Sequence, residues 1–302
     1  MKEGVHRKFM IGDEWLYFKI YSGPKMLESI LINEIHLLVD ELLKEQVIDK
    51  FFFIRYADPD YHLRVRFHLS EKSNLAEVVQ RFNKIIKPYV ENRLIWNVCT
   101  DTYNRELERY GRSTISEMET LFCIDSIAIL KTLKETENSG NDLHRWLWGV
   151  KYANTLIDLF GLTLQEKSRF CEANSNSFST EFNLNKPMKI QLDKKYRQEM
   201  AGLEKILKTD GEDKNIPGIK HIDWYSQQAG PVIQNVLDGF KSNELEMPLN
   251  NLLSSLAHMH FNRLFRTKQR MHEFVIYYFL NKFYKSQVAR LKYNSVKLSL
   301  DA

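Results

Sequence analysis

The chain has 302 residues, of which 43% are hydrophobic and 27% charged, a balance typical of a folded globular protein and unlike that of a disordered one. Its formal net charge is +4 and no block of like charges resembles a nucleic-acid-binding arm, so we expect no direct nucleic-acid partner. Three cysteines without a metal-ligand spacing, and no long apolar stretch, predict a cytoplasmic protein with reduced thiols and no membrane segment.

The first third of the chain alternates between strand and helix patterns. Four segments rich in aromatic and β-branched residues predict strands over residues 15–21, 49–56, 62–68 and 94–100. Apolar residues at helical spacing predict helices over residues 25–44 and 74–89. The order β-α-β-β-α-β matches a split βαβ, ferredoxin-like antiparallel sheet with helices on one face and the other face left for a site.

From residue 113 onward the pattern is helical, so we predict an α+β protein. A sheet region over residues 1–112 and a helical region over residues 113–302, which covers the sheet, would complete one site together. Helices are predicted over residues 113–133, 142–160, 224–240, 248–265 and 271–291, and after a capping box at Thr163 and Glu166. A second capping box is expected at Thr114 and Glu117.

Two polar segments interrupt this helical pattern. Residues 174–186 are rich in Ser and Asn and predict a loop, and residues 209–218 predict a flexible connection. The last helix carries an aromatic stripe that fits either the core or a contact between two copies of the chain, so a homodimer remains an alternative.

The strand at residues 62–68 carries a row of cations. Its alternation puts His62, Arg64 and Arg66 on one face and apolar residues on the other, with Arg55 just across the turn. These arginines could form a cradle for a carboxylate or another oxyanion, because guanidinium groups bind such groups with two parallel hydrogen bonds. A solvated face of an antiparallel sheet gives the same pattern.

Two further segments contain residues suited to chemistry. In DTYNRELERYG, the spacing places Glu106 and Arg109 on one face of a helix, where a surface ion pair is the simpler interpretation. In LSSLAHMHFNRLF, His260 falls on the apolar stripe of the helix, whereas His258 projects on the polar side and is more free to titrate. The periodicity therefore favours His258 over His260 as the functional histidine.

Together, FFFIRYADPDYHLRVRF, YNRELERYG and LSSLAHMHFNRLF resemble, in the same order, the C-terminal elimination domain of class I lantibiotic dehydratases. This domain also occurs as a stand-alone thiopeptide-type bacteriocin biosynthesis protein. The resemblance implies a lyase that eliminates glutamate from glutamylated Ser or Thr of a precursor peptide, giving dehydroalanine or dehydrobutyrine without a metal or cofactor. It implies catalytic roles for Arg64, Arg66, Glu106, Arg109 and His258. Substrate-binding roles are expected for Arg55, His62, Tyr103, Asn262 and Arg263.

By this resemblance, three arginines (Arg64, Arg66 and Arg109) would bind the glutamyl group and stabilise negative charge. His258 would move a proton, and Glu106 would orient Arg109 or accept a proton.

The resemblance also implies partners. Because the chain is too short to contain the glutamylation domain, we expect it to act on a precursor peptide after a separate tRNA-dependent glutamylating dehydratase. Two alternatives remain open: a pyridine-forming 4+2 cyclase of thiopeptide biosynthesis, and a non-catalytic subunit that binds a leader peptide along a sheet edge. The intact arginine motifs favour elimination.

Overall fold

The computed structural model describes residues 5–136, 142–209, 217–241 and 247–300. Its N-terminal part is built on a four-stranded antiparallel sheet with the strand order β3-β4-β2-β5. The strands of this sheet are β2 (Trp15–Tyr21), β3 (Ile48–Tyr56), β4 (His62–Leu69) and β5 (Asn97–Thr100). A separate two-stranded sheet, which the sequence pattern did not predict, pairs β1 (Lys8–Phe9) with β6 (Tyr103–Asn104). The α+β class is confirmed, while the split βαβ, ferredoxin-like topology stays a prediction.

The two faces of the sheet have different surroundings. On one face, Phe18 stacks on Phe82 of the following helix with their ring centroids 3.9 Å apart, and Leu63, Val65 and Phe67 are buried. The helices of this part are α1 (Pro24–Ile30), α2 (His36–Lys44) and α3 (Leu75–Glu91). A π-helical turn, η1 (Leu31–Ile35), separates α1 from α2 within the segment predicted as one helix, and a 3₁₀ turn, η2 (Lys72–Asn74), precedes α3.

The opposite face carries the cations, as the alternation predicted. The register pairs Arg66 with Tyr17 and with Phe52, and it pairs Arg64 with Lys19 and with Ile54. Directly paired residues of antiparallel strands project to the same side. On this face Arg66 therefore lies between two aromatic residues, and Arg64 lies between Ile54 and the cation Lys19.

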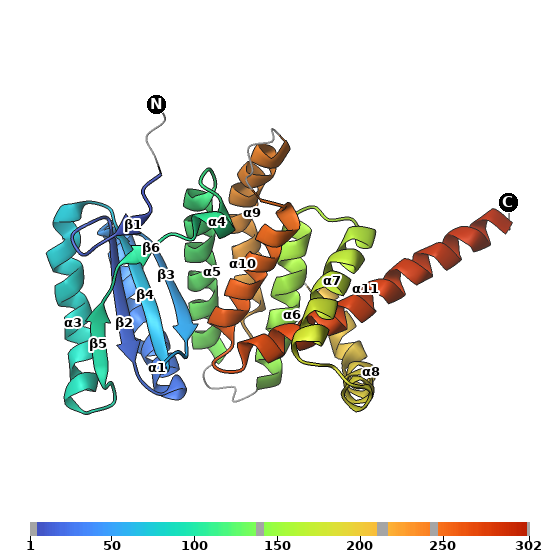
Figure 1. Cartoon of the computed structure of the whole chain (residues 1–302), viewed down its shortest axis with the longest axis horizontal. Helices are drawn as coiled ribbons and strands as arrows, with labels where there is room; N and C mark the ends of the chain where they lie inside the picture. Colours follow the sequence, from blue (N-terminus) through green and yellow to red (C-terminus); the bar gives the residue numbers. More distant parts are fainter. Residues whose placement is uncertain (1–4, 137–141, 210–216, 242–246, 301–302) are drawn as a thin grey trace.

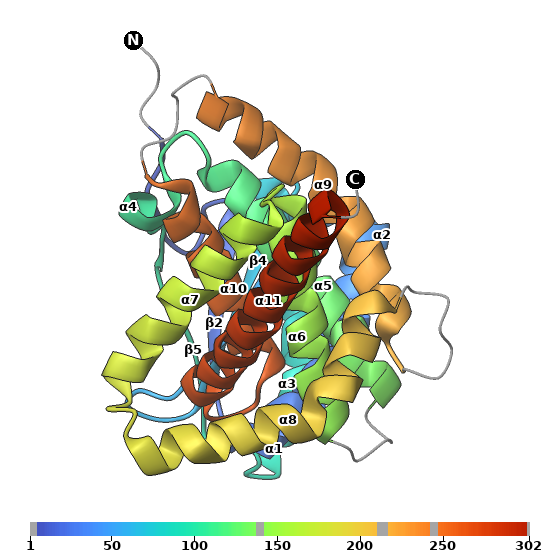
Figure 2. The same ribbon diagram turned by 90° about the vertical axis from the view of Figure 1, so that its right-hand side faces the viewer.

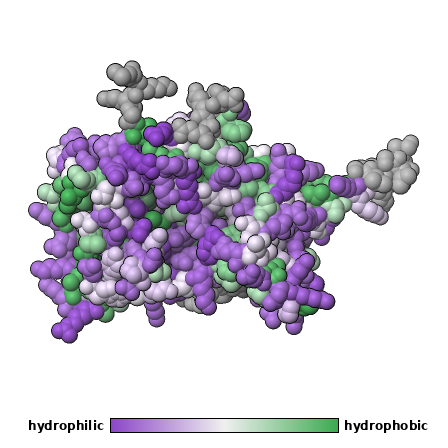
Figure 3. All heavy atoms as spheres, in the orientation of Figure 1, coloured by the Kyte–Doolittle hydropathy of each residue, from purple (hydrophilic) through white to green (hydrophobic). Residues whose placement is uncertain are grey.

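The second half of the chain is helical and lies beside the sheet, toward the β3 side (Figure 1). Its helices are α4 (Leu107–Tyr110), α5 (Ile115–Thr136), α6 (Asp142–Leu159), α7 (Leu164–Glu181), α8 (Lys186–Lys208), α9 (Ile219–Lys241), α10 (Leu249–Leu264) and α11 (Gln269–Leu300). In Figure 2, α11 crosses in front of α7 and α6, and its last turns extend beyond the other helices in Figure 1. Figure 3 shows a largely hydrophilic surface with scattered apolar residues.

Side chains of α5 and α10 occupy the outer edge of β3. The amide of Phe53 donates to Ser126 Oγ at 3.3 Å, and the Asn262 amide group bonds both the N–H and the C=O of Arg55 at 2.8 Å. An edge strand would otherwise present these backbone groups for pairing with another chain. The helical region thus meets the sheet at the β3 edge, whereas the sequence predicted that it would cover the sheet.

Two expectations for α7 and the start of α8 have different outcomes. The loop predicted over residues 174–186 is wrong, because α7 continues to Glu181 and α8 begins at Lys186. In α7, Phe178 is buried and Ser179 bonds the carbonyl of Ser175, so the polar side chains satisfy the helix instead of ending it. The Thr163–Glu166 capping box is confirmed.

At the other predicted capping box, the Thr114 hydroxyl donates back to the carbonyl of Tyr110. Of the predicted connection over residues 209–218, residues 210–216 lie outside the described part of the chain. The aromatic stripe of α11 is buried within the chain: Phe274, Tyr277, Phe279 and Tyr284 are at most 2% exposed. Among the described helices, none is long and apolar enough to cross a membrane.

Candidate active site

Arg66 is the centre of the candidate site. Its side chain projects from β4 into a cage of three aromatic rings, with the guanidinium carbon 4.2 Å from the ring centroid of Tyr17, 5.0 Å from Phe52 and 4.9 Å from Tyr103. Arg66 is only 6% exposed, and its Nε and Nη1 atoms have no hydrogen-bond partner in the described part of the chain. Burial lowers the pKa of Arg66, because a desolvated cation is less stable than a hydrated one.

A small cavity of about 40 Å³ opens beside Arg66, with room for about one water molecule or a group of similar size. Its lining comes from β3, β4, the segment around β6, α5 and α10, and it includes Tyr103, Glu106 and Arg263. The β1–β6 pair helps to build this wall, since Tyr103 pairs with Phe9 and stands over Arg66. Buried donors without partners beside a cavity are suited to binding an anion.

Glu106 and Arg109 link this cavity to α10. Arg109 Nη1 lies 3.4 Å from Glu106 Oε2, and Arg109 Nε donates to Ser255 Oγ at 3.1 Å. Both charged side chains are partly exposed, so their ion pair alone contributes little to stability. Burial raises the pKa of the neighbouring Tyr110 to about 12, so its hydroxyl stays protonated near neutral pH.

His258 lies one helical turn beyond Ser255 on α10 and pairs with a carboxylate that sequence reasoning missed. Its Nδ1 atom is 2.8 Å from Glu273 Oε2 on α11. The Glu273 side chain is 4% exposed and that of His258 is 26% exposed. Because a carboxylate can only accept, Nδ1 carries the proton and Nε2 of the neutral ring is left with a free lone pair.

The other predicted histidine lies in the interior. His260 Nδ1 is 2.6 Å from Asp125 Oδ1, and Arg263 Nη1 is 2.8 Å from the other oxygen of the same carboxylate. Burial alone would raise the pKa of Asp125, but the charges and hydrogen bonds of His260 and Arg263 lower it. The two histidines therefore lie on different sides of α10: His258 is partly exposed and His260 is buried, as the apolar periodicity of the sequence predicted.

Arg64 and His62 form a pair on the same sheet face, next to the cavity. The guanidinium of Arg64 lies 3.6 Å from the ring centroid of Tyr56, and its Nε donates to His62 Nε2 at 3.1 Å. His62 Nδ1 donates to the carbonyl of Asp60. His62 therefore positions Arg64, which is more exposed than Arg66 and does not line the cavity.

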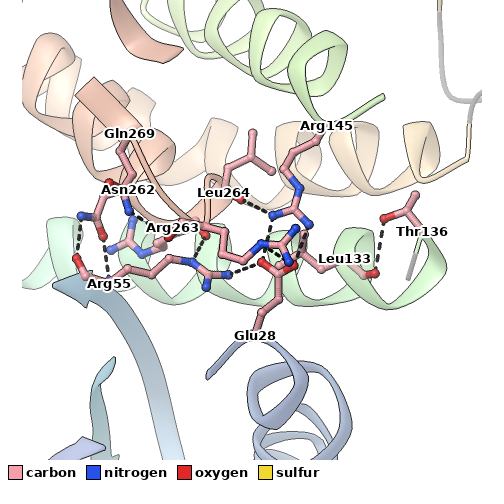
Figure 4. Close-up of polar contacts among 10 residues, drawn as sticks. Glu28, Arg55, Leu133, Thr136, Arg145, Asn262, Arg263, Leu264 and Gln269 are labelled. Carbon is pink, nitrogen blue, oxygen red and sulfur yellow. Dashed lines mark hydrogen bonds and ion pairs between the residues drawn. The ribbon is translucent and has the colours of Figure 1, made fainter. Parts of the chain in front are cut away.

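Arg55 lies away from these arginines, although the sequence predicted that they would share a cradle. The register pairs it with Leu63, on the opposite face of the sheet from Arg64. There it bonds Glu28 of α1 at 3.0 Å and the carbonyl of Arg263 (Figure 4). Asn262 binds the Arg55 backbone, so it too lies at the β3 edge, and neither residue lines the cavity.

Glu28 pairs with Arg55 and Arg145, as Figure 4 shows, and Arg266 Nε lies 3.7 Å from the same carboxylate. Burial alone would raise the pKa of Glu28, but the hydrogen bond from Arg145 and the surrounding positive charges hold it at about 2. Burial lowers the pKa of Arg55 to about 10, and the charge of Glu28 opposes that change. This cluster joins the sheet part to the helical part.

Tyr103 and Arg263 combine structural contacts with a place in the cavity wall. The Tyr103 hydroxyl donates to Glu119 at 2.9 Å, and Arg263 Nε donates to the carbonyl of Phe53 at 2.9 Å. In the described part of the chain, no group of three or more His, Cys, Asp or Glu side chains could hold a metal ion. His258 does not line the Arg66 cavity, and its link to the arginines runs along α10 through Ser255, which accepts a hydrogen bond from Arg109. Fixed cations and an imidazole are groups suited to binding an anion and removing a proton.

Two residues near His258 were missed in the sequence because their patterns only weakly indicated a functional role. Glu273 is a lone carboxylate in the aromatic segment 271–279, and Ser255 lies three residues before His258 on the same helix. An isolated acid on an otherwise apolar helix is rarely buried without a partner. Which partner it has depends on the packing of α11 against α10, and the sequence alone does not give that packing.

Comparison with characterised proteins supports the resemblance. Over 271 residues, the chain is 26% identical to the subtilin biosynthesis protein SpaB of Bacillus subtilis. The match covers 89% of this chain and 25% of SpaB. Over 287 residues, it is 25% identical to the nisin biosynthesis protein NisB of Lactococcus lactis subsp. lactis. This match covers 91% of this chain and 26% of NisB. The chain thus spans about a quarter of the length of these relatives.

Two solved structures share the fold at lower identity. The tRNA-dependent lantibiotic dehydratase MibB from Microbispora sp. 107891 matches with a TM-score of 0.70 and 19% identity, over 93% of this chain and 29% of MibB. TbtD, a pyridine synthase from thiomuracin biosynthesis, matches with a TM-score of 0.61 and 12% identity, over 91% of this chain and 98% of TbtD. Residues 15–284 match the family described as "Lantibiotic biosynthesis dehydratase C-term", and the chain belongs to this family.

Proposed function

We propose that this chain eliminates glutamate from glutamylated Ser or Thr residues of a precursor peptide. In this reaction a base removes the Cα proton and the Cα–Cβ double bond forms. The bond from Cβ to the ester oxygen breaks, and glutamate leaves with its new carboxylate. The products are dehydroalanine from Ser and dehydrobutyrine from Thr, and no oxidant or reductant is consumed.

The observation that carries this proposal is the buried, unpartnered guanidinium of Arg66. A cation that is 6% exposed and has two unpaired nitrogen atoms is costly for the folded protein unless an anion completes its hydrogen bonds. A glutamylated serine supplies such an anion twice, as the enolate that develops on its own backbone carbonyl and as the departing carboxylate of glutamate. A fixed cation stabilises such developing charge without having to reorganise.

His258 acts as the base in this proposal. With its Nδ1 proton held by Glu273, the ring presents Nε2 to the Cα proton, and the carboxylate stabilises the imidazolium that forms. Burial of Glu273 favours this orientation, because little water reaches the carboxylate to compete with the ring.

Arg109 binds the glutamyl group on the side nearest α10, where Ser255 and Glu106 hold its guanidinium. Arg64 provides a second charge at the mouth of the site, positioned by His62. A series of contacts leads from the sheet face toward His258: Glu106 lines the Arg66 cavity and pairs with Arg109, and Arg109 donates to Ser255, one helical turn before His258.

The precursor peptide must arrive already glutamylated. We propose that a separate dehydratase carries out that step with glutamyl-tRNA; MibB, which shares the fold over this chain, is a tRNA-dependent lantibiotic dehydratase. A pyridine-forming cyclase remains an alternative, because MibB and TbtD share the fold alike. The retained arginines favour elimination. A pure leader-binding role along β3 is disfavoured, because side chains already occupy that edge.

The test is direct. Purified chain is incubated with a synthetic peptide that carries one O-glutamyl serine, and loss of glutamate is followed by mass spectrometry. We expect dehydroalanine with the wild type and at least about a 100-fold slower reaction with Arg66→Ala or His258→Ala. Glu172→Gln, a change in a surface ion pair with Lys285, serves as the control and should react at the wild-type rate. Absence of elimination with the wild type would reject the proposal.

A further inference from the structure

A second cavity, of about 680 Å³, lies between α7 and the start of α10. Its volume is typical of ligand sites, whereas the cavity at Arg66 is far smaller. We propose that this α7–α10 groove binds the backbone of the substrate peptide next to the residue that is modified. The inference rests on the proposed elimination and names a binding surface for the peptide that flanks the reacting serine or threonine.

The groove is continuous with the candidate site along one stripe of α10. Asn250 and Ser254 line the groove, and His258 follows them at the same four-residue spacing. Residues four apart on a helix lie above one another, about 6 Å along the axis. The groove therefore ends about one helical turn from the imidazole.

The lining of the groove matches the chemistry of a peptide backbone. Asn174, Ser177, Asn250, Asn251 and Ser254 supply amides and hydroxyls. In the described part of the chain, the side chains of Ser177, Asn250 and Asn251 make no hydrogen bond, so they are available to a ligand. Side-chain amides both donate and accept, as a peptide backbone requires, and they select no particular charge.

Across the floor of the groove, Ser254 Oγ donates to Asn174 Oδ1 at 3.2 Å and ties α10 to α7. Charged groups occur only at the far end of the lining, at Glu166 and Arg169. The centre of the groove is thus neutral, which suits a peptide whose modified residues are neutral Ser or Thr and whose neighbours vary.

The dimensions set how much peptide the groove can hold. From Leu249 to Ser254, α10 rises about 8 Å, and an extended peptide advances about 3.3 Å per residue. The groove therefore accommodates about two to three residues, separated from the reacting residue by one or two more. A substrate with only one residue on each side of the modified serine cannot reach it.

This difference between short and long substrates provides the test. The short substrate is an acetylated, amidated tripeptide, Ala-Ser-Ala, with glutamate esterified to the serine. The long substrate is a 13-residue peptide of Gly, Ala and Ile with the same glutamylated serine at its centre. Two variants, Ala173→Trp and Ser177→Trp, fill the groove from α7. Gln165→Trp adds the same ring on α7 at an exposed position outside the lining and serves as the control.

For the wild type, we expect the KM of the long peptide to be about tenfold lower than that of the short one. Ala173→Trp and Ser177→Trp should raise the KM of the long peptide about tenfold, change its kcat by less than about twofold and leave the short peptide unaffected. Gln165→Trp should match the wild type. Equal KM values for the long peptide in all four proteins would overturn the groove assignment, while continued elimination would leave the proposed function intact.

If no elimination is detected, a binding measurement tests the α7–α10 groove independently of the proposed elimination activity. A fluorescein-labelled form of the long peptide, with unmodified serine, is titrated with each protein and its anisotropy is recorded. Binding that Ala173→Trp weakens and Gln165→Trp preserves, without any elimination, supports the groove and rejects the lyase. Elimination of the short peptide together with the same affinity of every variant for the labelled peptide rejects the groove alone.

Discussion

The Nδ1 atom of His258 lies 2.8 Å from Oε2 of Glu273, a carboxylate whose side chain is 4% exposed. This pair joins α10 to α11 and decides which ring nitrogen of His258 carries the proton. The other ring nitrogen, Nε2, is left as the acceptor that a proton transfer requires. Arg270 Nη1 lies 3.8 Å from the same oxygen of Glu273, whereas the more exposed Glu106 pairs with Arg109.

The first prediction concerns Glu273→Gln. The side-chain amide of glutamine can donate a hydrogen bond to Nδ1, which favours the tautomer with its proton on Nε2. In that tautomer Nε2 has no lone pair to accept the Cα proton of the substrate. We expect kcat for elimination to fall about 100-fold or more. Glu273→Asp keeps an acceptor and should retain more activity than Glu273→Gln. Equal rates for Glu273→Gln and the wild type would show that the carboxylate does not set the tautomer.

Residue alternation was enough to predict where Arg64, Arg66 and His258 project, because each lies on a regular element with one apolar face. It was not enough for Arg55. Both faces of β3 carry large apolar residues, with Phe51 and Phe53 on one side and Phe52 and Ile54 on the other. The pattern therefore did not reveal that Arg55 projects with Leu63, away from Arg64. Only the pairing register of β3 with β4 determines the side of the sheet to which Arg55 projects.

Contacts between distant segments explain the other missed features. The β1–β6 pair joins residues about 95 positions apart, and neither two-residue strand has a sequence pattern of its own. The Ser- and Asn-rich end of α7 is helical because it packs against α11, where Phe178 meets the ring of Phe274. Tertiary packing there outweighs the low helix propensity of Ser and Asn.

The second prediction is that Arg66→Met stabilises the protein while abolishing elimination. Arg66 is buried with two unpaired nitrogen atoms, and a buried charge without full hydrogen bonding costs more than a well-packed apolar group of similar size. Methionine can fill the cage of Tyr17, Phe52 and Tyr103. We expect the free energy of unfolding to rise by about 1–3 kcal/mol.

Urea denaturation with Arg64→Met as the matched control measures this effect. Arg64 is half-exposed and bonded to His62, so its replacement should change the free energy of unfolding by less than about 0.5 kcal/mol. A loss of stability in Arg66→Met would mean that the aromatic cage repays the desolvation of the guanidinium, contrary to the argument for an anion site.

The third prediction concerns acid stability at Glu28. Its pKa is about 2 in the folded protein, below the ordinary value of 4.5, so it contributes stability that is fully present above pH 4.5 and is lost as the pH falls through about 2. That difference corresponds to about 3 kcal/mol. We expect Glu28→Gln, which leaves Arg55 and Arg145 without their anion, to reduce the free energy of unfolding at pH 7 by about 3 kcal/mol or more.

Urea midpoints of the wild type and Glu28→Gln should therefore converge as the pH is lowered from 5 to 2. Glu91→Gln, a change in an exposed ion pair with Lys87, serves as the control and should follow the wild type throughout. A constant difference between Glu28→Gln and the wild type across this pH range would show that the loss in the variant is not a loss of charge.

The last prediction separates the two histidines of α10 with the same substitution. His258→Asn keeps a donor for Glu273 but has no lone pair with the basicity of imidazole, so elimination should fall at least about 100-fold with little change in urea stability. His260→Asn should do the opposite. Its ring bonds Asp125 and packs 4.2 Å from the ring centroid of Tyr152, so the shorter side chain leaves a void and a weaker pair.

For His260→Asn we expect a loss of about 2 kcal/mol in the free energy of unfolding and a kcat within about threefold of the wild type at a temperature where the variant is folded. Elimination rates with the glutamylated peptide and urea denaturation curves are measured for both variants. Together they show which of the two histidines acts as the base. If His260→Asn lost elimination while His258→Asn kept it, the buried histidine would be the base, and the polar stripe of α10 would have another role.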